Sequence, residues 1–323
     1  MQALSFKEVC DFQSSLGNPT AKVIYELVND QKFKPYFTNL LERKHNTVTE
    51  DCPLKGLSIY ESSDEEVSFN LNDSYYFNIK DPSIITEPKL LETVLEMGLN
   101  LDTIIFPFEG YEKYFVPFTA LYVKLAPTYD EYLKSLNSKH RNKVLSLDRK
   151  SGGVTYTISD TPNDEGLLYN LENASKHNEE DLDCSMYYKS QILYTTALKL
   201  SGYNKCWFQT IYDEEKKVIG YSSVIYDEVQ KELLHYSNCS ERNLGSYSIN
   251  NFIKFFCGTE YELLNLVSYP EYPWNDANDC SVNGYKRPLS NLKVTRKSIT
   301  SLDDASETST PPYYDLEKHK WIL

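Results

Sequence analysis

The segment from residue 232 to residue 256 is the part of the sequence best suited to bind a phosphate group. A predicted strand over 232–238 leads into a glycine-containing turn at Gly245, and a predicted helix then runs to Phe256. The first N–H groups of a helix have no acceptor within the helix, and they lie at the positive end of its dipole. Such a turn between a strand and a helix therefore suits a pyrophosphate. A glycine at the start of a helix is equally compatible with a purely structural role.

A second candidate is the basic segment from Asp130 to Lys150. It carries six Lys or Arg residues, whereas the chain as a whole has a formal net charge of -14. Its apolar residues recur at roughly helical spacing, which predicts an amphipathic helix with a cationic face. This face either meets an anionic ligand or is a solvated helix surface. We expect Arg141 and Lys143 to contact an anionic donor or acceptor.

Composition narrows the class of protein. The chain has 323 residues, of which 41% are hydrophobic, so it can form two domains or one large domain with a packed core. No apolar run reaches the length of a membrane span and the N-terminus lacks a signal-peptide pattern, so we expect a cytoplasmic protein with no membrane partner. The acidic balance disfavours nonspecific nucleic-acid binding. The seven cysteines are scattered and never spaced as Cys-x-x-Cys, so neither a disulfide framework nor a metal site is expected.

The order of predicted elements indicates an α/β arrangement. No site is predicted in the first third, where the acidic run 64–66 is most simply a solvated loop. The elements expected there are helices over 7–16, 20–42 and 87–97, and strands over 56–60, 67–71, 75–79 and 103–108. Those expected afterwards are strands over 115–125, 154–158, 205–212, 218–226, 232–237 and 263–268, and helices over 165–177 and 185–200. The three strands between 205 and 237 predict an antiparallel meander, in which Gly220 marks the least bulky point.

Residues 126–144, Ala-Pro-Thr-Tyr-Asp-Glu-Tyr-Leu-Lys-Ser-Leu-Asn-Ser-Lys-His-Arg-Asn-Lys-Val, resemble the segment that opens the catalytic half of FemAB-like or BioF2-like acyltransferases. These enzymes belong to the GCN5-related N-acetyltransferase (GNAT) superfamily. The resemblance covers roughly residues 100–295. It implies an α/β (α+β) fold of tandem GNAT-like domains, each a mixed, mostly antiparallel twisted sheet flanked by helices. It implies a scaffold domain at 1–114, a catalytic domain at 115–295, and a flexible linker and tail at 296–323.

The resemblance also implies a co-substrate site at the strand–turn–helix. GNAT enzymes hold the coenzyme A pyrophosphate on an Arg/Gln-x-x-Gly-x-Gly/Ala turn, and Arg242-x-x-Gly245-x-Tyr247 is similar at its first two fixed positions. Tyr247 replaces a small residue at the third position, which fits the FemAB-like branch better than ordinary acetyltransferases. Strand 263–268 is then expected to part from its neighbour and admit the acyl-thioester arm of an acyl-CoA, acetyl-CoA most of all. The residues implied in holding it are Tyr236, Ser237, Asn238, Arg242, Leu244, Gly245, Ser246 and Tyr247.

A catalytic element is implied near the end of the sheet. Tyr285 and Lys286 resemble the Tyr/Phe-Lys motif of the FemAB-like family, whose lysine is thought to stabilise the oxyanion that forms as an amine attacks an activated carbonyl. A base is needed only to take a proton from the acceptor ammonium. Asp276 is the first candidate for this base. The alternatives are Glu271, His177, His235 and Asp183, of which His235 is as readily a core histidine. His177 and Trp274 are also expected at the substrate.

The implied reaction is transfer of an acyl group from acyl-CoA to an amine, without a metal. The acceptor is a small molecule, a peptide, a sugar amine or a modified nucleotide, among which the sequence does not choose. One alternative is an aminoacyl-tRNA-dependent transferase of FemAB type, against which stand the acidity and the absence of a long coiled-coil arm. Nucleic acid enters only as this acceptor or as the tRNA donor. The other alternative is a non-catalytic GNAT-like scaffold. The sequence does not determine the oligomeric state.

Overall fold

The computed structural model of the chain divides into two compact units. The first contains the described residues up to Phe118 and from Thr295 onward, and the second contains those from Thr119 to Val294. The predicted domain boundaries after residues 114 and 295 stay predictions. The structure describes residues 2–47, 49–51, 58–61, 67–69, 100–101, 104–105, 116–174, 182–228, 231–241, 244–266, 289–299, 313–315 and 320–322.

The first unit begins with a strand that leads into a capped helix. β1 (Gln2–Ser5) is followed directly by α1 (Phe6–Ser15). Ser5 and Glu8 form a capping box, in which the Ser5 N–H donates to the Glu8 carboxylate at 2.7 Å and the Glu8 N–H donates to Ser5 Oγ. Gly17, with a φ of 87°, follows the helix and allows the chain to turn. The predicted helix over 7–16 is confirmed.

The prediction of a single helix over residues 20–42 is wrong. The segment forms three pieces, α2 (Thr20–Asn29), the 3-10 turn η1 (Lys34–Phe37) and α3 (Thr38–Glu42). The first break is at Asp30, whose carboxylate accepts a hydrogen bond from the Lys32 N–H at 2.8 Å and so stabilises a local turn. Pro35 then lacks the N–H that an α-helix needs. The helical spacing persists in the sequence because each piece still buries apolar side chains.

The sheet of the first unit has the strand order β1-β2-β3-β4-β5. β2 (Lys44–Thr47), β3 (Ser58–Glu61) and β4 (Val67–Phe69) continue it in antiparallel pairs, and β5 (Asn100–Leu101) pairs with β4 in parallel. The strands predicted over 56–60 and 67–71 are therefore confirmed within the described residues. The strand predicted over 75–79 and the helix predicted over 87–97 lie outside them. In the same unit, β6 (Ile104–Ile105) pairs with Ser298 and Ile299.

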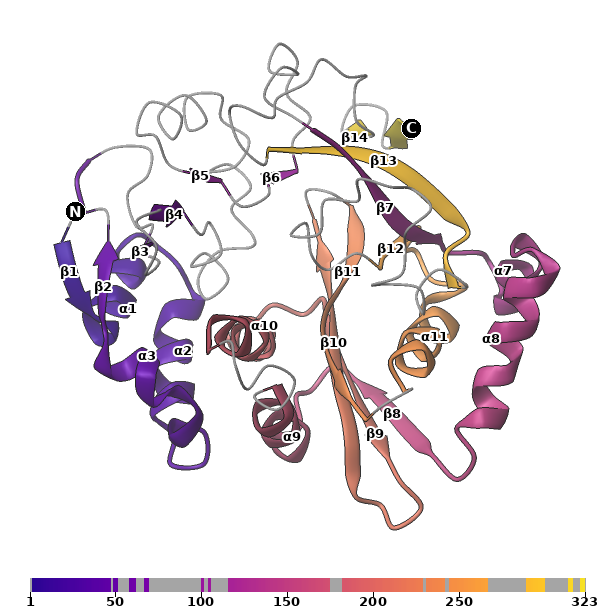
Figure 1. The fold of residues 1–323 in the computed structure, drawn as a ribbon, viewed down its shortest axis with the longest axis horizontal. Coiled ribbons are helices and arrows are strands. Elements are labelled where there is room, and N and C mark those ends of the chain that lie inside the picture. Colours follow the sequence, from indigo (N-terminus) through magenta and orange to yellow (C-terminus); the bar gives the residue numbers. More distant parts are fainter. Residues whose placement is uncertain are drawn as a thin grey trace. The chain divides into compact units, whose positions relative to one another are not determined.

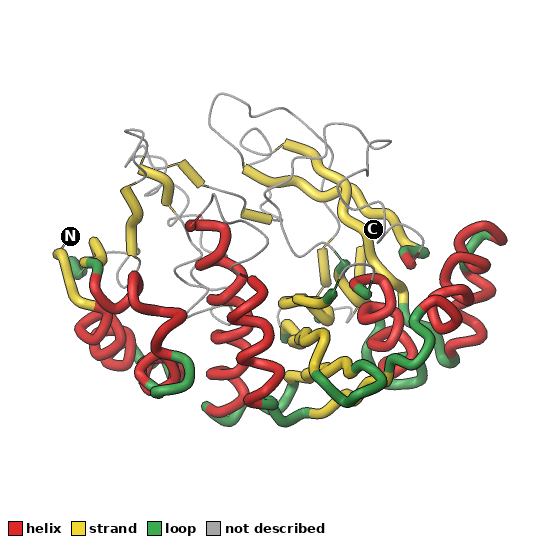
Figure 2. The backbone as a smooth tube through the Cα atoms, turned by 60° about the horizontal axis from the view of Figure 1, so that its bottom comes forward, coloured by secondary structure: helices red, strands yellow, loops and turns green. Residues whose placement is uncertain are grey.

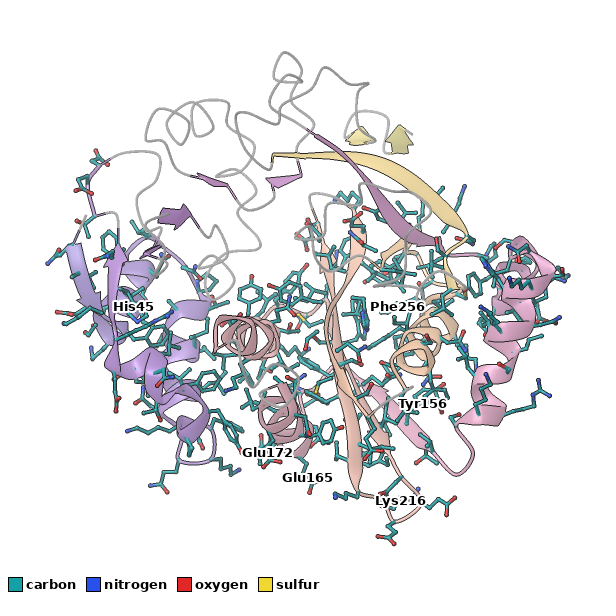
Figure 3. The ribbon with its side chains drawn as sticks, in the orientation of Figure 1. His45, Tyr156, Glu165, Glu172, Lys216 and Phe256 are labelled. Carbon is teal, nitrogen blue, oxygen red and sulfur yellow. The ribbon has the colours of Figure 1, made fainter. Side chains whose placement is uncertain are left out.

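The second unit is built on a mixed, mostly antiparallel sheet, as predicted. Its strands follow the order β13-β7-β12-β11-β10-β9-β8. Only β11 and β12 run parallel among the pairs described. The strands are β7 (Val116–Lys124), β8 (Thr155–Ser159), β9 (Cys206–Tyr212), β10 (Val218–Asp227), β11 (Glu232–Ser240), β12 (Leu263–Asn265) and β13 (Leu292–Ile299). The predicted meander is confirmed, and Lys216 lies at the tip of its first hairpin (Figure 3).

Helices cover both faces of this sheet. Figure 1 shows α9 and α10 on one face of β9, β10 and β11 and α11 on the other, and Figure 2 shows the same layers from another side. The basic segment forms two helices, because Asn137 starts a new one by accepting from the His140 N–H at 2.9 Å. The helices are α7 (Tyr129–Ser135), α8 (Ser138–Lys150), α9 (Asp164–Ala174), α10 (Leu182–Leu200) and α11 (Gly245–Phe256).

The main core of the second unit lies between the sheet and the helices α7, α8 and α11. It is apolar and close-packed, and it fixes α11 against β10 and β11. Its fully buried side chains include Val123, Tyr132, Val144, Val224, Leu233, Ile249, Phe252, Ile253, Phe256 and Leu264.

In the chain beyond residue 295, where a linker was predicted, β13 continues to Ile299, and β14 (Tyr313–Asp315) pairs with β15 (Lys320–Ile322).

Candidate functional site

The parallel pair β11 and β12 is short. Leu233 pairs with Leu264 and Leu234 pairs with Asn265, and within the described residues the ladder ends there. β11 nevertheless continues to Ser240, still paired with β10 on its other side. Of the chain that follows β12 the structure describes only Leu266, so the described ladder between β11 and β12 consists of these two pairs. We call the end of the ladder, after Leu234 and Asn265, the fork.

A row of buried polar side chains lies at the base of the fork. Asn265 Nδ2 donates to Glu232 Oε1 at 3.0 Å and lies 3.3 Å from the Tyr122 hydroxyl oxygen. Glu232 is 2% exposed and Asn265 5% exposed. One amide thus joins β11, β12 and β7 immediately below the point where the ladder ends. This row holds the three strands in register because a one-residue slip would move every side chain to the other face.

A β-bulge interrupts β11 just above the fork. Ser223 of β10 pairs with Ser237 while Val224 pairs with His235, so Tyr236 is an additional residue in β11. The Tyr236 ring packs edge-on against Tyr194 of α10, with centroids 6.0 Å apart. Bulges often lie beside active sites, where they redirect side chains. The sequence-predicted residues Tyr236 and Ser237 therefore both belong to the segment of β11 that follows its described pairs with β12.

The N-terminus of α11 follows β11 after a short turn. Leu244 is the N-cap residue, with φ -90° and ψ -10°, and its apolar side chain offers the helix no acceptor. The first intrahelical bond runs from the Ser248 N–H to the Leu244 carbonyl at 2.8 Å, so the preceding N–H groups have no acceptor within the helix. No acidic residue occupies the first turn. The positive end of the helix dipole is therefore not neutralised by its own first turn.

Tyr247 points away from this turn and into the protein. It is 6% exposed and packs with Ile211 and Ile219 in a small apolar cluster. Its ring contacts Tyr156 edge-on at a centroid distance of 5.9 Å, and burial raises the pKa of its hydroxyl. Tyr156 lies on β8, on the same side of the sheet as Phe256 of α11 (Figure 3). A large residue at the third position of the motif is thus accommodated without its ring occupying the turn.

A polar row crosses the face of the sheet under α11, and the sequence patterns did not predict it. Gln209, Ser222 and Asn238 stand directly opposite one another in β9, β10 and β11. Ser248 of α11 reaches down to the row, since its Oγ lies 2.5 Å from Gln209 Oε1 and 2.8 Å from Ser222 Oγ. The only signal in the sequence is that uncharged polar residues interrupt otherwise apolar segments. Finding the row requires the strand register.

The two basic residues expected at an anion lie on α8 in different environments. The Arg141 guanidinium donates to the carbonyls of Leu133 at 2.7 Å, Leu136 at 3.0 Å and Lys134 at 3.3 Å. It thereby caps the C-terminal end of α7, where carbonyls lack helical partners. Lys143 is exposed on the surface of α8. Contact of either residue with an anionic ligand stays a prediction.

Several predicted residues lie outside the part of the chain or the side chains that the structure describes. His235 is described, and it is 1% exposed and packs edge-on against Phe252 at 5.9 Å, as a core histidine would. Among the described residues no group of three or more His, Cys, Asp or Glu gathers as a metal site would, and no helix is long and apolar enough to cross a membrane. The predicted residues not described are Asp276, Tyr285, Lys286, Trp274, His177, Arg242, Glu271 and the side chain of Asp183.

Comparison with known proteins gives structural likenesses only. No family model and no curated protein matches the chain. The solved structure of L-PGS from Bacillus licheniformis is similar over 86% of this chain and 93% of that one, with 9% identity and a TM-score of 0.43. FemX is similar over 94% and 98%, with 10% identity and a TM-score of 0.40. A tandem GNAT protein from the clavulanic acid biosynthesis pathway is similar over 66% and 58%, with 10% identity and a TM-score of 0.30. Likenesses of this size define no function for the chain.

Proposed function

We propose that the second unit is an N-acyltransferase that takes an acyl group from acyl-CoA, acetyl-CoA most of all, and forms an amide with an acceptor amine. The observation that carries the proposal is the course of β11. This strand continues beyond its last described pair with β12, passes through the bulge at Tyr236, and leads to the N-terminus of α11, whose N-cap residue Leu244 offers no side-chain acceptor. We propose that the edge of β11 beyond the fork receives the acyl arm and that the first turn of α11 receives the phosphates.

The two parts of this segment match the two parts of the donor. The pantetheine arm of coenzyme A carries amides, and an exposed strand edge pairs with extended amide chains through its main-chain groups. The pyrophosphate follows the arm, and the first turn of α11 presents N–H groups and a positive dipole end to it. The thioester would then lie at the fork, between β11 and β12. Ser237 and Asn238 would flank the arm, and Gly245 and Ser246 the phosphates.

The proposed reaction needs one bond to form and one to break. The lone pair of the acceptor amine attacks the thioester carbonyl, the C–N bond forms, and the C–S bond breaks to release coenzyme A as its thiol. The proton lost by the attacking nitrogen ends on the leaving sulfur, directly or through a base. Asp276 is the first candidate for this base, and the resemblance implies that Lys286, preceded by Tyr285, stabilises the oxyanion. These three assignments belong to the proposal.

Native mass spectrometry with acetyl-CoA and longer acyl-CoAs tests the donor. We expect a one-to-one adduct that is lost in Gly245→Trp, because the indole would occupy the space over the first turn of α11. Gly152→Trp is the matched control, since Gly152 is exposed in the turn after α8 and an added Cβ has 3.9 Å to its nearest atom. An adduct that survives Gly245→Trp, or no adduct with the wild type, would overturn the acyl-CoA proposal.

The exposed lysines of α8 favour one alternative donor. Lys139, Lys143 and Lys150 are exposed and, at 100° per residue, fall on one side of α8. A row of cations of this kind suits the phosphates of an aminoacyl-tRNA. Transfer from aminoacyl-tRNA without an acyl-CoA adduct would establish that donor. Absence of both activities would leave the second unit as a binding scaffold.

A further inference from the structure

We infer that Gln209, Ser222 and Ser248 form a positioning network that holds the first turn of α11 in the setting required to bind pyrophosphate, an inference that rests on the function proposed above. The three side chains come from β9, β10 and α11, respectively. None of them is proposed to touch the ligand. They act through the backbone N–H groups one turn above.

The geometry of the network is compact and fully enclosed. Both hydroxyls converge on one atom, with Gln209 Oε1 accepting from Ser248 Oγ at 2.5 Å and from Ser222 Oγ at 3.3 Å. The two hydroxyl oxygens are 2.8 Å apart. Gln209 and Ser248 are 0% exposed and Ser222 is 1% exposed. Ser248 is also the residue whose N–H makes the first intrahelical bond. The network therefore contacts the helix at its N-terminal turn.

Polar contacts add directional constraints to the packing of α11. Farther along the helix, Asn250 Oδ1 accepts from the Tyr129 hydroxyl at 2.8 Å and Lys254 pairs with Asp148 at 2.8 Å, whereas Ser248 bonds to the sheet close to the first turn. Ile249, Phe252 and Ile253 pack the helix against the sheet through apolar surface. Apolar burial is itself non-directional, so it constrains the rotation of the helix less sharply than hydrogen bonds do. Hydrogen bonds weaken steeply when their geometry is lost. The bond from Ser248 to the sheet therefore favours one rotation of the first turn, and with it one direction for the N–H groups there.

A second observation extends the polar row toward β11. Gln209 Nε2 is buried and has no hydrogen-bond partner in the part of the chain that the structure describes, and the same is true of Asn238 Oδ1. Buried polar groups are nearly always paired, so groups left over in this way call for a water, an ion or a functional explanation. Asn238 lies on β11 above the fork, opposite Ser222. The row thus runs from the interior to the strand that borders the proposed site.

The chain contains a matched control for this network. Ser222 and Ser223 are adjacent on β10, are 1% and 0% exposed, and face opposite sides of the sheet. Ser222 contacts Ser248 of α11, whereas Ser223 Oγ donates to Thr195 Oγ1 of α10 at 3.2 Å. Ser222→Ala and Ser223→Ala therefore each remove one buried hydroxyl contact between the sheet and a helix. Only the first removes a contact with α11.

The experiment measures the affinities of acetyl-CoA and of inorganic pyrophosphate by isothermal titration calorimetry for the wild type, Ser222→Ala, Ser248→Ala and Ser223→Ala. We expect Ser248→Ala to weaken both ligands by about tenfold, and Ser222→Ala to weaken both by a smaller factor, because one or two hydrogen bonds are lost. The two ligands should lose affinity by the same factor, since the change affects the phosphate turn. Ser223→Ala should bind both as the wild type does. Thermal denaturation should show similar losses of stability for both serine variants of β10.

The other outcomes each have a definite meaning. If the wild type binds both ligands and Ser222→Ala and Ser248→Ala bind them equally well, the positioning network is refuted while the proposed function stands. The same holds if Ser223→Ala weakens binding as much as Ser222→Ala, because the effect is then one of general stability. If the wild type binds neither ligand, the proposed phosphate site itself is refuted, and the network has no such site to position.

Discussion

Asn265 and Glu232 are joined by a hydrogen bond of 3.0 Å between two parallel strands, beside the last pair that the structure describes for them. Both side chains are buried, and the Asn265 amide also lies 3.3 Å from the Tyr122 hydroxyl oxygen. A buried carboxylate requires donors, because removing a charge from water without compensation is strongly unfavourable. The fork is thus closed at its base by a polar contact whose loss would affect three strands at once.

Replacing Asn265 by Leu should destabilise the second unit. The change removes a donor from the Glu232 carboxylate and leaves a buried charge less well compensated, so we expect a loss of about 2–3 kcal/mol in the free energy of unfolding. Chemical denaturation followed by fluorescence measures this loss. The double variant Glu232→Leu/Asn265→Leu should be less destabilised than the sum of the two single variants, because it no longer buries the charge. Strict additivity would show that the two residues do not interact.

Gly166→Ala should destabilise the packing of α9 on β10. A Cβ at Gly166 would lie 2.2 Å from a ring atom of Tyr221. The Tyr221 ring has little room to move away, because it is 0% exposed and stacks on Phe208. Alanine favours a helix over glycine by up to about 1 kcal/mol, but overpacking a core costs about 1–3 kcal/mol, so the net effect should be a loss of stability. Thermal denaturation measures it. Gly152→Ala should be near neutral, because its Cβ would lie 3.9 Å from the nearest atom, the Arg149 carbonyl oxygen. Equal effects of the two changes would contradict the close packing at Gly166.

Arg141 and Lys143 should differ in their effects on stability. Arg141→Ala removes three donors from carbonyls at the end of α7, so we expect a loss of about 1–2 kcal/mol. Lys143→Ala changes an exposed side chain and should remain within about 0.5 kcal/mol of the wild type. Chemical denaturation compares them. A salt-dependent loss of ligand affinity in Lys143→Ala, without loss of stability, would support the predicted anion contact. Equal destabilisation would show that the capping role of Arg141 is wrong.

The sequence was most informative where local patterns coincide with the tertiary structure. The strands of the meander are separated by polar turns, and at Lys216 and Lys231 the turns adopt positive φ values of 67° and 54°. The alternation of strand-like segments and polar turns along the sequence was therefore enough to predict β9, β10 and β11. The strand–turn–helix could be predicted for the same reason, since its parts are consecutive along the chain. The helix over 20–42 was mispredicted because the side chain of Asp30 stabilises a turn that hydrophobic periodicity does not record.

The polar contacts of the site could not be predicted from local patterns. Gln209, Ser222 and Ser248 are separated by 13 and 26 residues along the chain, and they meet only because β9 and β10 pair in one particular register. A shift of one residue would place Ser223 under α11 instead. The pairing of Asn265 with Glu232 depends in the same way on the short parallel ladder. Such contacts are properties of the register, which a single sequence determines only through the whole fold.

His45 in the first unit should make the stability of the protein depend on pH. It is 6% exposed, its Nε2 lies 3.0 Å from the Leu40 carbonyl oxygen, and Figure 3 shows it on β2. A carbonyl can only accept, so neutral His45 carries its proton on Nε2. Burial lowers the pKa of His45 to about 4, although the bond to Leu40 opposes this shift. In the unfolded chain the imidazole has its ordinary pKa of about 6.5.

The sign of the effect follows from these two values. Between about pH 6.5 and pH 4 the unfolded chain binds a proton that the folded chain does not, so the free energy of unfolding falls as the pH is lowered, by up to about 3 kcal/mol. Above pH 6.5 the residue is neutral in both states and contributes no pH dependence. His45→Gln, which has no titrating group, should lose this component when denaturation is measured from pH 7.5 to pH 4. An NMR titration of the folded protein that places the His45 pKa near 6.5 would contradict the burial of its ring.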